Sequence, residues 1–248
     1  MQTRSQPLRR RLSVAVIGPD GAGKTTICRR IPETLGLPVR HVYMGINPDA
    51  SNHMLFTTRL LNRLKRLRGA APEPPGPLDP ERETRPPKNP LRRVARALKR
   101  SLTLADCLAD EWYRQALVWY YQWRGNVVLL DRHFLFDFYT SDAERGEGRR
   151  PLSRRIHGFC LTRFYPRPDL VVFLDAPGEV LYARKGEWTP ERLEQRRREF
   201  RRLERLVDHF VVIDATLPED EVLARVCEQI DTSSRLIEAY DLHRQRER

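Results

Sequence analysis

A glycine-rich segment that ends in lysine and threonine is the part of this 248-residue sequence best suited to chemistry. Residues 18–25 read GPDGAGKT, which fits the spacing G-x-x-x-x-G-K-[ST] without a mismatch. Glycines let a backbone turn its N–H groups inward, so that the loop becomes a cup of donors for phosphate. In such a loop the lysine, here Lys24, reaches the β- and γ-phosphates, and the hydroxyl of Thr25 completes a Mg²⁺ site. The segment therefore predicts a site for a nucleoside triphosphate.

A second polar group follows another apolar run, Val127 to Leu130, which ends at Asp131. Because the carboxyl ends of parallel strands meet at one edge of a sheet, we expect Asp131 beside the glycine-rich loop. There it would accept a hydrogen bond from a Mg²⁺-bound water or take the proton of a phosphoryl acceptor. The next residue, Arg132, offers a planar fork for phosphate or carboxylate, or else forms a structural ion pair. We expect His133 to be only a ring packed at the end of the strand.

A third group of charged residues lies in the arginine-rich stretch that begins at Arg184. Most of its arginines are expected to be solvated and paired with glutamates at helical spacing. Phosphoryl transfer spreads negative charge over the moving group, which arginines on a closing segment can stabilise. We expect Arg184, Lys185 and Arg192 to be the residues of this stretch that reach phosphate.

Short β-branched runs that alternate with helical patterns must position these groups, and this alternation predicts an α/β fold with a parallel sheet. Helices are expected from Lys24 to about Leu35, from Leu91 to Arg124, from Glu179 into the arginine-rich stretch, and from Pro218 to Ile230. Pro32 should end or kink the first of them early. The expected strands are residues 12–17, 39–43, 127–130, 170–174 and 209–214.

The pattern from Leu91 to Arg124 predicts one long helix that Gly125 ends as a C-cap. Apolar residues follow one another there in steps of three and four, so we expect this stripe to pack on the sheet. Its tryptophans are expected to be core residues rather than a platform for bases. The stripe consists of Leu91, Val94, Leu98, Leu102, Ala105, Ala109, Trp112, Ala116, Trp119 and Trp123.

Positive charge is concentrated between Arg59 and Arg100. This segment contains thirteen Lys or Arg and four acidic residues, so it carries nine of the twelve net positive charges. Residues 51–68 have the pattern of a basic amphipathic helix, and the proline-rich residues 70–90 that of an exposed loop or linker. This insertion is either a solvated surface or a docking surface for a membrane or another polyanion.

Four isolated cysteines, without C-x-x-C pairs, indicate reduced thiols rather than a disulfide framework or a zinc site. The basic first eleven residues are not followed by the apolar stretch of a secretory signal. We therefore expect a cytoplasmic protein. A length of 248 residues suits one domain, with the basic helix and mobile proline-rich loop inserted at about 51–90.

Four segments together resemble the thymidylate kinase-like branch of the nucleoside monophosphate kinases: GPDGAGKTT, VVLLDRH, PDLVVFLDAPGEVLYARKGE and VVIDA. The resemblance implies a three-layer P-loop NTPase fold with a central parallel five-stranded sheet and helices on both faces, carrying here a basic proline-rich insertion. It also implies ATP- and Mg²⁺-dependent transfer of the γ-phosphoryl group to a small phosphorylated acceptor, most simply a nucleoside monophosphate. Members are often homodimers.

The resemblance also implies roles for single residues. Asp20 would face the acceptor's sugar hydroxyl, Arg132 would hold the acceptor's phosphate, and a lid starting at Arg184 would close over ATP. Two thymidylate kinase segments have no counterpart: VYMG stands in place of an Arg-Glu-Pro segment, and residues 134–142 lack the Ser-x-x-Ala-Tyr-Gln that helps hold thymine. The acceptor therefore stays open, and so does a different function, a nucleotide-dependent switch that binds a polyanion or membrane.

The expected site is thus defined in three parts. The nucleotide contacts are Gly18, Asp20, Gly21, Ala22, Gly23, Lys24, Thr25, Thr26, Arg184 and Lys185. The catalytic residues are Lys24, Asp131, Arg132, Arg184 and Arg192. The metal ligands are Thr25 and Asp131.

Overall fold

The computed structural model describes residues 12–45, 53, 55, 90–144 and 152–246. The predicted basic helix at 51–68 and the proline-rich loop at 70–90 lie outside this part of the chain, except for His53, Leu55 and Pro90. All five predicted strands are present, with small differences at their ends. They are β1 (Ser13–Ile17), β2 (Val39–Tyr43), β3 (Val127–Asp131), β4 (Leu170–Asp175) and β5 (Phe210–Asp214).

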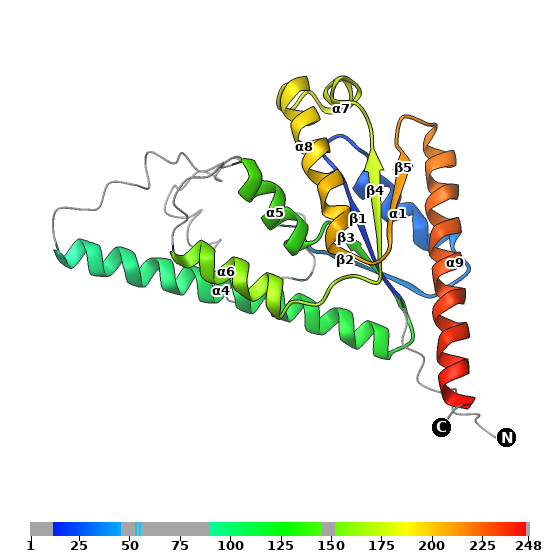
Figure 1. Cartoon of the computed structure of the whole chain (residues 1–248), viewed down its shortest axis with the longest axis horizontal. Coiled ribbons are helices and arrows are strands. Elements are labelled where there is room, and N and C mark those ends of the chain that lie inside the picture. Colours follow the sequence, from blue (N-terminus) through cyan, green and yellow to red (C-terminus); the bar gives the residue numbers. More distant parts are fainter. Residues whose placement is uncertain (1–11, 46–52, 54, 56–89, 145–151, 247–248) are drawn as a thin grey trace.

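The five strands form one parallel sheet in the order β2-β3-β1-β4-β5. Strands β1, β3 and β4 are buried along their whole length, as the uninterrupted apolar runs predicted. Because all strands run the same way, the loops that follow β1, β3 and β4 open at the same edge of the sheet (Figure 1). The predicted three-layer α/β fold is confirmed.

Alternate residues of each strand enter two separate cores, one on each face of the sheet. Val14 and Val16 face the core that α1 and α9 close, whereas Ala15 and Ile17 face the core filled from α5, α6 and the end of α8. Figure 1 shows these helices on the two sides of the sheet. Their bounds are α1 (Lys24–Thr34), α4 (Pro90–Trp123), α5 (Phe134–Glu144), α6 (Leu152–Arg163), α7 (Gly178–Lys185), α8 (Pro190–Arg202) and α9 (Glu219–Arg246).

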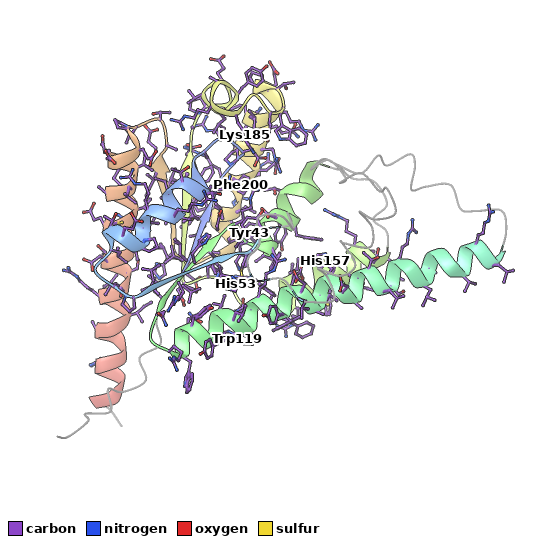
Figure 2. The ribbon with its side chains drawn as sticks, turned by 180° about the vertical axis from the view of Figure 1, so that it is seen from behind. Tyr43, His53, Trp119, His157, Lys185 and Phe200 are labelled. Carbon is purple, nitrogen blue, oxygen red and sulfur yellow. The ribbon has the colours of Figure 1, made fainter. Side chains whose placement is uncertain are left out.

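The long helix α4 is present as predicted, but the predicted packing of its apolar stripe on the sheet is wrong. The stripe faces outward: Leu91 is 77% and Trp123 is 63% exposed, and its members Leu98, Leu102, Ala105 and Ala109 are exposed too. Figure 2 shows Trp119 on the side of α4 that faces away from the sheet. Among the side chains of α4 that the structure describes, the buried ones are mostly polar, namely Asp110, Glu111, Arg114, Gln115 and Val118.

Hydrogen bonds explain why the polar side of α4 is buried. The Arg114 guanidinium donates to the carbonyl oxygens of Tyr43 and Gly45, at 3.3 and 3.0 Å, just after β2, and it pairs with Asp110. The Asp110 carboxylate also accepts from the backbone N–H of Leu55 at 2.9 Å. These bonds satisfy backbone groups that leave the sheet, and an apolar helix face has no donors or acceptors for that purpose.

Three further helices differ in part from expectation. The first, α1, has the predicted bounds but does not end early at Pro32, because a proline in the last turn removes one N–H donor without stopping the helix. The predicted continuous helix after Glu179 is two helices, since Gly186 and Trp188 have φ values of +66° and +70° between α7 and α8. The closing helix, α9, extends to Arg246. Within the described residues, none of the helices has the length and apolar content that crossing a membrane requires.

Candidate nucleotide and phosphate site

The glycine-rich loop connects β1 to α1 and approaches two other backbone segments closely. Gly18 and Gly21 have φ values of +151° and +89°. A Cβ atom on Gly18 would lie 2.7 Å from the carbonyl oxygen of Leu174 in β4, and one on Gly21 would lie 2.6 Å from that of Leu181 in α7. Gly23 precedes α1 with a φ of +84° and open space around it. The first two glycines are therefore required by contact as well as by conformation.

Lys24 begins α1 and lies almost completely inside the protein, with 5% of its surface exposed. Its ammonium group donates to the carbonyl oxygen of Pro19 across the loop, at 2.6 Å. Burial lowers the pKa of Lys24 to about 8, with help from Arg132, while Asp20 and Asp131 act in the opposite direction. An anion bound in the loop would favour the charged form of this buried lysine and so raise its pKa again. This is the behaviour expected of a lysine that binds phosphate.

Thr25 and Asp131 lie together, as the sequence predicted from their positions after two strands. The Thr25 hydroxyl donates to Asp131 Oδ2 at 2.9 Å, and His41 Nε2 lies 3.8 Å from the same oxygen. Burial would raise the pKa of Asp131, but His41, Thr25 and Lys24 together hold it below its usual value. The other carboxylate oxygen, Oδ1, is buried and makes no hydrogen bond to the described residues.

These donor atoms fit a magnesium ion. The Thr25 hydroxyl and the ionised Asp131 carboxylate, one of whose oxygens has no hydrogen-bond partner among the described residues, are hard oxygen ligands. Mg²⁺ prefers such ligands, usually together with water and phosphate oxygens. The residues that would hold it are Thr25 and Asp131.

Asp20 lies between two arginines that come from distant parts of the chain. Arg132 Nη2 donates to one of its carboxylate oxygens at 2.9 Å, and Arg196 Nη1 donates to the other at 2.8 Å. Burial alone would raise the pKa of Asp20, but Lys24, Arg132 and Arg196 hold it well below its usual range. Arg132 itself has a φ of +70°, a conformation that is strained in a residue with a side chain.

One more carboxylate belongs to this group, Asp137 in the first turn of α5. Burial raises its pKa, whereas the positive charges of Arg132, Lys24 and Arg196 lower it and the negative charge of Asp20 raises it further. The site thus contains cations and carboxylates in close proximity, since Lys24, Arg132 and Arg196 all lower the pKa values of both Asp20 and Asp137. An anionic ligand can compete with Asp20 for these cations.

The segment from α7 to α8, residues 178–202, covers the carboxyl ends of the strands and is called the lid segment below (Figure 1). Arg184 and Lys185 lie in the last turn of α7 and are exposed to solvent. The ammonium group of Lys185 pairs with the carboxylate of Glu187 at 2.8 Å (Figure 2). The guanidinium of Arg192 lies over the Trp188 ring, 4.3 Å from its centre. The contacts described here for Lys185 and Arg192 are thus with neighbouring residues of the lid segment.

The lid segment is instead tied to the sheet through Asp175 at the end of β4. Arg197 donates to both of its carboxylate oxygens, at 2.6 and 3.0 Å, and Arg201 donates to Oδ2 at 2.7 Å. Burial would raise the pKa of Asp175, but these two hydrogen-bonded arginines hold it below its usual value. Arg196, which directly precedes Arg197 on α8, is the lid arginine that donates to Asp20 in the loop.

The structure therefore brings together Asp20, Lys24, Thr25, Asp131 and Arg132 from the predicted set. Ala22 is buried in the loop, and Thr26 is exposed in the first turn of α1. His133 is a buried ring against Phe136 and Tyr165, as expected, and burial lowers its pKa to about 3.

Three side chains near the site were not predicted from the sequence: His41, Asp137 and Arg196. Of these, only Arg196 could have been found from the sequence. It follows Arg192 by four residues, so the two arginines share one face of the helix, where both lie over Trp188.

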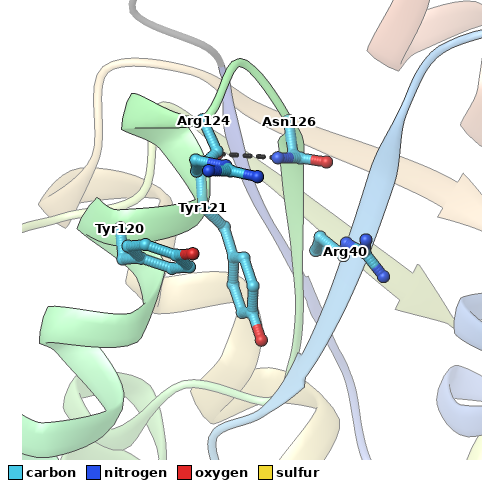
Figure 3. Close-up of a pocket in the computed structure, with 5 residues that line it drawn as sticks. All are labelled: Arg40, Tyr120, Tyr121, Arg124 and Asn126. Carbon is cyan, nitrogen blue, oxygen red and sulfur yellow. Dashed lines mark hydrogen bonds between the residues drawn. The ribbon is translucent and has the colours of Figure 1, made fainter.

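A surface hollow of about 230 Å³ lies elsewhere, at the opposite end of the sheet (Figure 3). Tyr120 and Tyr121 of α4 line it, together with Arg124 just after that helix, Arg40 of β2 and Asn126 before β3. The Asn126 side chain donates to the carbonyl oxygen of Tyr121 at 3.0 Å. Because Asn126 and Arg40 precede or begin their strands, the hollow is remote from Lys24 and Asp131, which lie at the carboxyl ends of the strands.

Comparison with known proteins gives a consistent result. The chain is 29% identical over 220 residues to the thymidylate kinases of Xanthomonas oryzae pv. oryzae strains PXO99A, MAFF 311018 and KACC10331 / KXO85. The matched region covers 86% of this chain and 79% of each relative. No protein-family model matches the sequence. The chain is thus a distant relative of thymidylate kinases, and the resemblance seen in its motifs is confirmed.

Proposed function

We propose that this protein is a kinase that uses ATP and Mg²⁺ to phosphorylate a small acceptor that already carries phosphate, most simply a nucleoside monophosphate. The observation that carries this proposal is the meeting of Lys24, Thr25 and Asp131 at one edge of the sheet, beside the Asp20, Arg132 and Arg196 group. The distant similarity to thymidylate kinases supports the same reaction class.

In this proposal the loop and Lys24 bind the β- and γ-phosphates of ATP, and Thr25 and Asp131 hold the ion. Bound Mg²⁺ would neutralise charge that develops on the phosphate oxygens. Lys24 is already desolvated, so it needs no reorganisation to face a phosphate. Arg132 and Arg196 would transfer from Asp20 to phosphate oxygens of the substrates, and this exchange would leave Asp20 available to a hydroxyl of the acceptor.

The test is ADP formation by purified full-length protein with Mg·ATP and a panel of nucleoside monophosphates, nucleosides and sugar phosphates. Thymidylate comes first because the relatives bear that name. We expect one acceptor class to be used and Lys24→Ala to lower kcat/KM by at least about 100-fold, as for loss of one preorganised donor. The control is Arg225→Ala, an exposed arginine of α9 that pairs with Glu221.

The proposal fails if no member of the panel is phosphorylated and Lys24→Ala binds ATP as well as the natural protein does. Activity that falls equally in Arg225→Ala would also contradict it. The other function considered, a switch that binds a polyanion or membrane through Arg59 to Arg100, gains no support from the comparisons. Most of that segment lies outside the described residues.

We also propose that the partner of this chain is a second copy, bound through the outward face of α4. From Ala105 to Trp123 the exposed positions of this face are all alanine, tryptophan or tyrosine, and the charged residues point inward or are only partly exposed. Protein interfaces are enriched in aromatic residues and depleted of charge at their centre, and alanines let two helices approach closely. A two-fold axis pairs such a face with itself.

A further inference from the structure

A cluster of three side chains with metal-binding chemistry lies outside the phosphate site, between α4 and α6. Cys107 and Glu111 are one helical turn apart on α4, and His157 comes from α6 (Figure 2). His157 Nε2 lies 2.8 Å from Glu111 Oε1, and the Cys107 thiol donates to the same oxygen at 3.6 Å. One ligand atom from each residue lies within 4.8 Å of the other two.

Burial of Glu111 is the second observation that points to a cation. The residue is 4% exposed, and its Oε2 atom is buried without a hydrogen-bond partner among the described residues. A buried carboxylate with an unsatisfied oxygen is costly unless a positive charge compensates it. The neighbouring cation, Arg114, is already paired with Asp110 and bonded to two carbonyl oxygens. The carboxylate of Glu111 is therefore only half satisfied.

The neighbouring aromatic side chains, Tyr165 and Phe138, contact the cluster without bonding to its carboxylate. Tyr165 donates its hydroxyl hydrogen to the backbone oxygen of Glu111, at 3.3 Å, and not to the carboxylate. The ring of His157 packs edge-on against Phe138, with 5.4 Å between centres. Burial and Glu111 raise the pKa of the Cys107 thiol, so without a cation it stays protonated.

We infer that Cys107, Glu111 and His157 bind one Zn²⁺ ion that links α4 to α6. A tetrahedral Zn²⁺ with bonds of about 2.0–2.3 Å holds its ligand atoms roughly 3.3–3.8 Å apart. The sulfur-to-oxygen separation of 3.6 Å already fits this range. The nitrogen-to-oxygen separation of 2.8 Å lengthens by a few tenths of an ångström when the ion replaces the shared proton.

The mixed donor set selects the class of metal. Thiolate, imidazole and carboxylate together suit zinc, whereas Mg²⁺ and Ca²⁺ require oxygen ligands. Three protein ligands leave the fourth position to water. This site is separate from the one formed by Thr25 and Asp131, so it stands or falls independently of the kinase proposal.

The position of the ion suggests a structural role. Gly158, next to His157, packs so closely on Phe138 that a Cβ atom there would lie 2.6 Å from the ring. Phe138 belongs to α5, the helix that carries Asp137. Fixing α6 on α4 therefore also fixes the support of α5 beside the phosphate site.

The experiment uses full-length protein freed of metal and titrated with Co²⁺, which replaces zinc and absorbs strongly when bound to thiolate. We expect a cobalt–thiolate band at one ion per chain, displaced by Zn²⁺, and a rise in Tm on adding Zn²⁺. Cys107→Ser should lose the band, and His157→Ala should lose both the d–d absorption of a tetrahedral site and the rise in Tm. Cys160→Ser, a thiol on α6 outside the cluster, and His209→Ala, an exposed histidine, should behave as the natural protein does.

Circular dichroism of each variant establishes that it is folded, and the two ligand variants serve as independent checks on one another. No cobalt–thiolate band in the natural protein would overturn the inference and leave a simple Glu111–His157 ion pair. A band that persists in Cys107→Ser would overturn it too, because the ion would then lie at another cysteine.

Discussion

Lys24 is the residue on which the electrostatics of the candidate site depend. Its ammonium group is buried among Asp20, Asp131 and Arg132, with one carbonyl oxygen as its hydrogen-bond partner. Burial and Arg132 disfavour its charge more than the two aspartates favour it, so that its pKa falls from 10.5 to about 8. In the ligand-free protein the charged lysine therefore costs stability, which a bound phosphate would restore.

Lys24→Met is expected to raise the free energy of unfolding of the ligand-free protein at pH 7 by about 1–2 kcal/mol. The shift in pKa corresponds to about 3 kcal/mol of unfavourable charge burial, from which the lost hydrogen bond subtracts about 1 kcal/mol. Because the folded pKa is the lower one, the cost is complete below about pH 8 and disappears as the pH rises through 10.5. Urea unfolding at pH 7 and at pH 10 measures both effects.

The control for this prediction is Lys185→Met, an exposed lysine paired with Glu187, which should change stability by less than about 0.5 kcal/mol. Mg·ATP should stabilise the natural protein and not Lys24→Met. A variant that is less stable than the natural protein at pH 7 would show that the favourable charges of Asp20 and Asp131 outweigh burial.

Sequence spacing was sufficient to predict part of the site at the scale of residues. The loop motif and the strand that ends in Asp131 specify backbone positions, and parallel strands bring their ends together whatever the rest of the chain does. The lid arginines depend on the turn between α7 and α8, where Gly186 and Trp188 redirect the chain. Helical spacing alone therefore did not show that Arg196, rather than Arg192, reaches Asp20.

At the scale of elements, α4 is the clearest departure from expectation. Periodicity predicted both the helix and its apolar stripe, but a stripe specifies only a face that avoids water, and not which surface covers it. The opposite face carries Asp110, Glu111 and Arg114, which bond the backbone after β2 and the side chain of His157. Because this face supplies the hydrogen bonds that those groups need, it is the side of the helix that is buried.

Ala109→Arg should separate the proposed pair of chains. Ala109 lies in the part of α4 whose exposed residues are uncharged, where a bulky, charged arginine would face the same residue of its symmetry mate. We expect light scattering after size-exclusion chromatography to give the mass of two chains for the natural protein and of one for the variant. Ala224→Arg, an exposed position of α9, should retain the larger mass.

A natural protein that elutes with the mass of one chain at every concentration would contradict this prediction. Equal dissociation of Ala109→Arg and Ala224→Arg would place the contact elsewhere than on α4.

For the whole molecule, the sheet and its two cores were predictable and the strand order was not. Apolar runs that end in Asp131 and Asp175 define strands buried on both faces, and this pattern requires helices on either side. Order within the sheet depends on contacts between strands far apart in sequence, such as Val14 with both Leu129 and Leu170. No local pattern records those contacts.

The whole protein is also expected to lose stability in acid in two stages. Burial lowers the pKa of His133 from 6.5 to about 3, so between these values the unfolded chain binds a proton that the folded protein does not. The free energy of unfolding then falls as pH falls, by up to about 1.4 kcal/mol per pH unit for one proton. Below about pH 4 the ion-paired Asp20 and Asp175, whose pKa values are lowered, add to the loss.

Urea unfolding between pH 7 and pH 4 measures this dependence, and His133→Leu, which fills the same aromatic pocket without titrating, should flatten it. His209→Ala, an exposed histidine before β5, is the matched control and should keep the slope. The same slope in His133→Leu and in the natural protein would assign the acid sensitivity to other groups.

The stacking of two arginines on Trp188 makes the lid segment visible to spectroscopy. Arg192 and Arg196 lie 4.3 and 5.6 Å from the centre of this ring, and Arg196 also holds Asp20 in the loop. The other three of the four tryptophans are on α4. A protein with those three replaced by phenylalanine would emit from Trp188 alone. Its fluorescence would then follow the release of Arg196 from Asp20 in real time, without an attached dye.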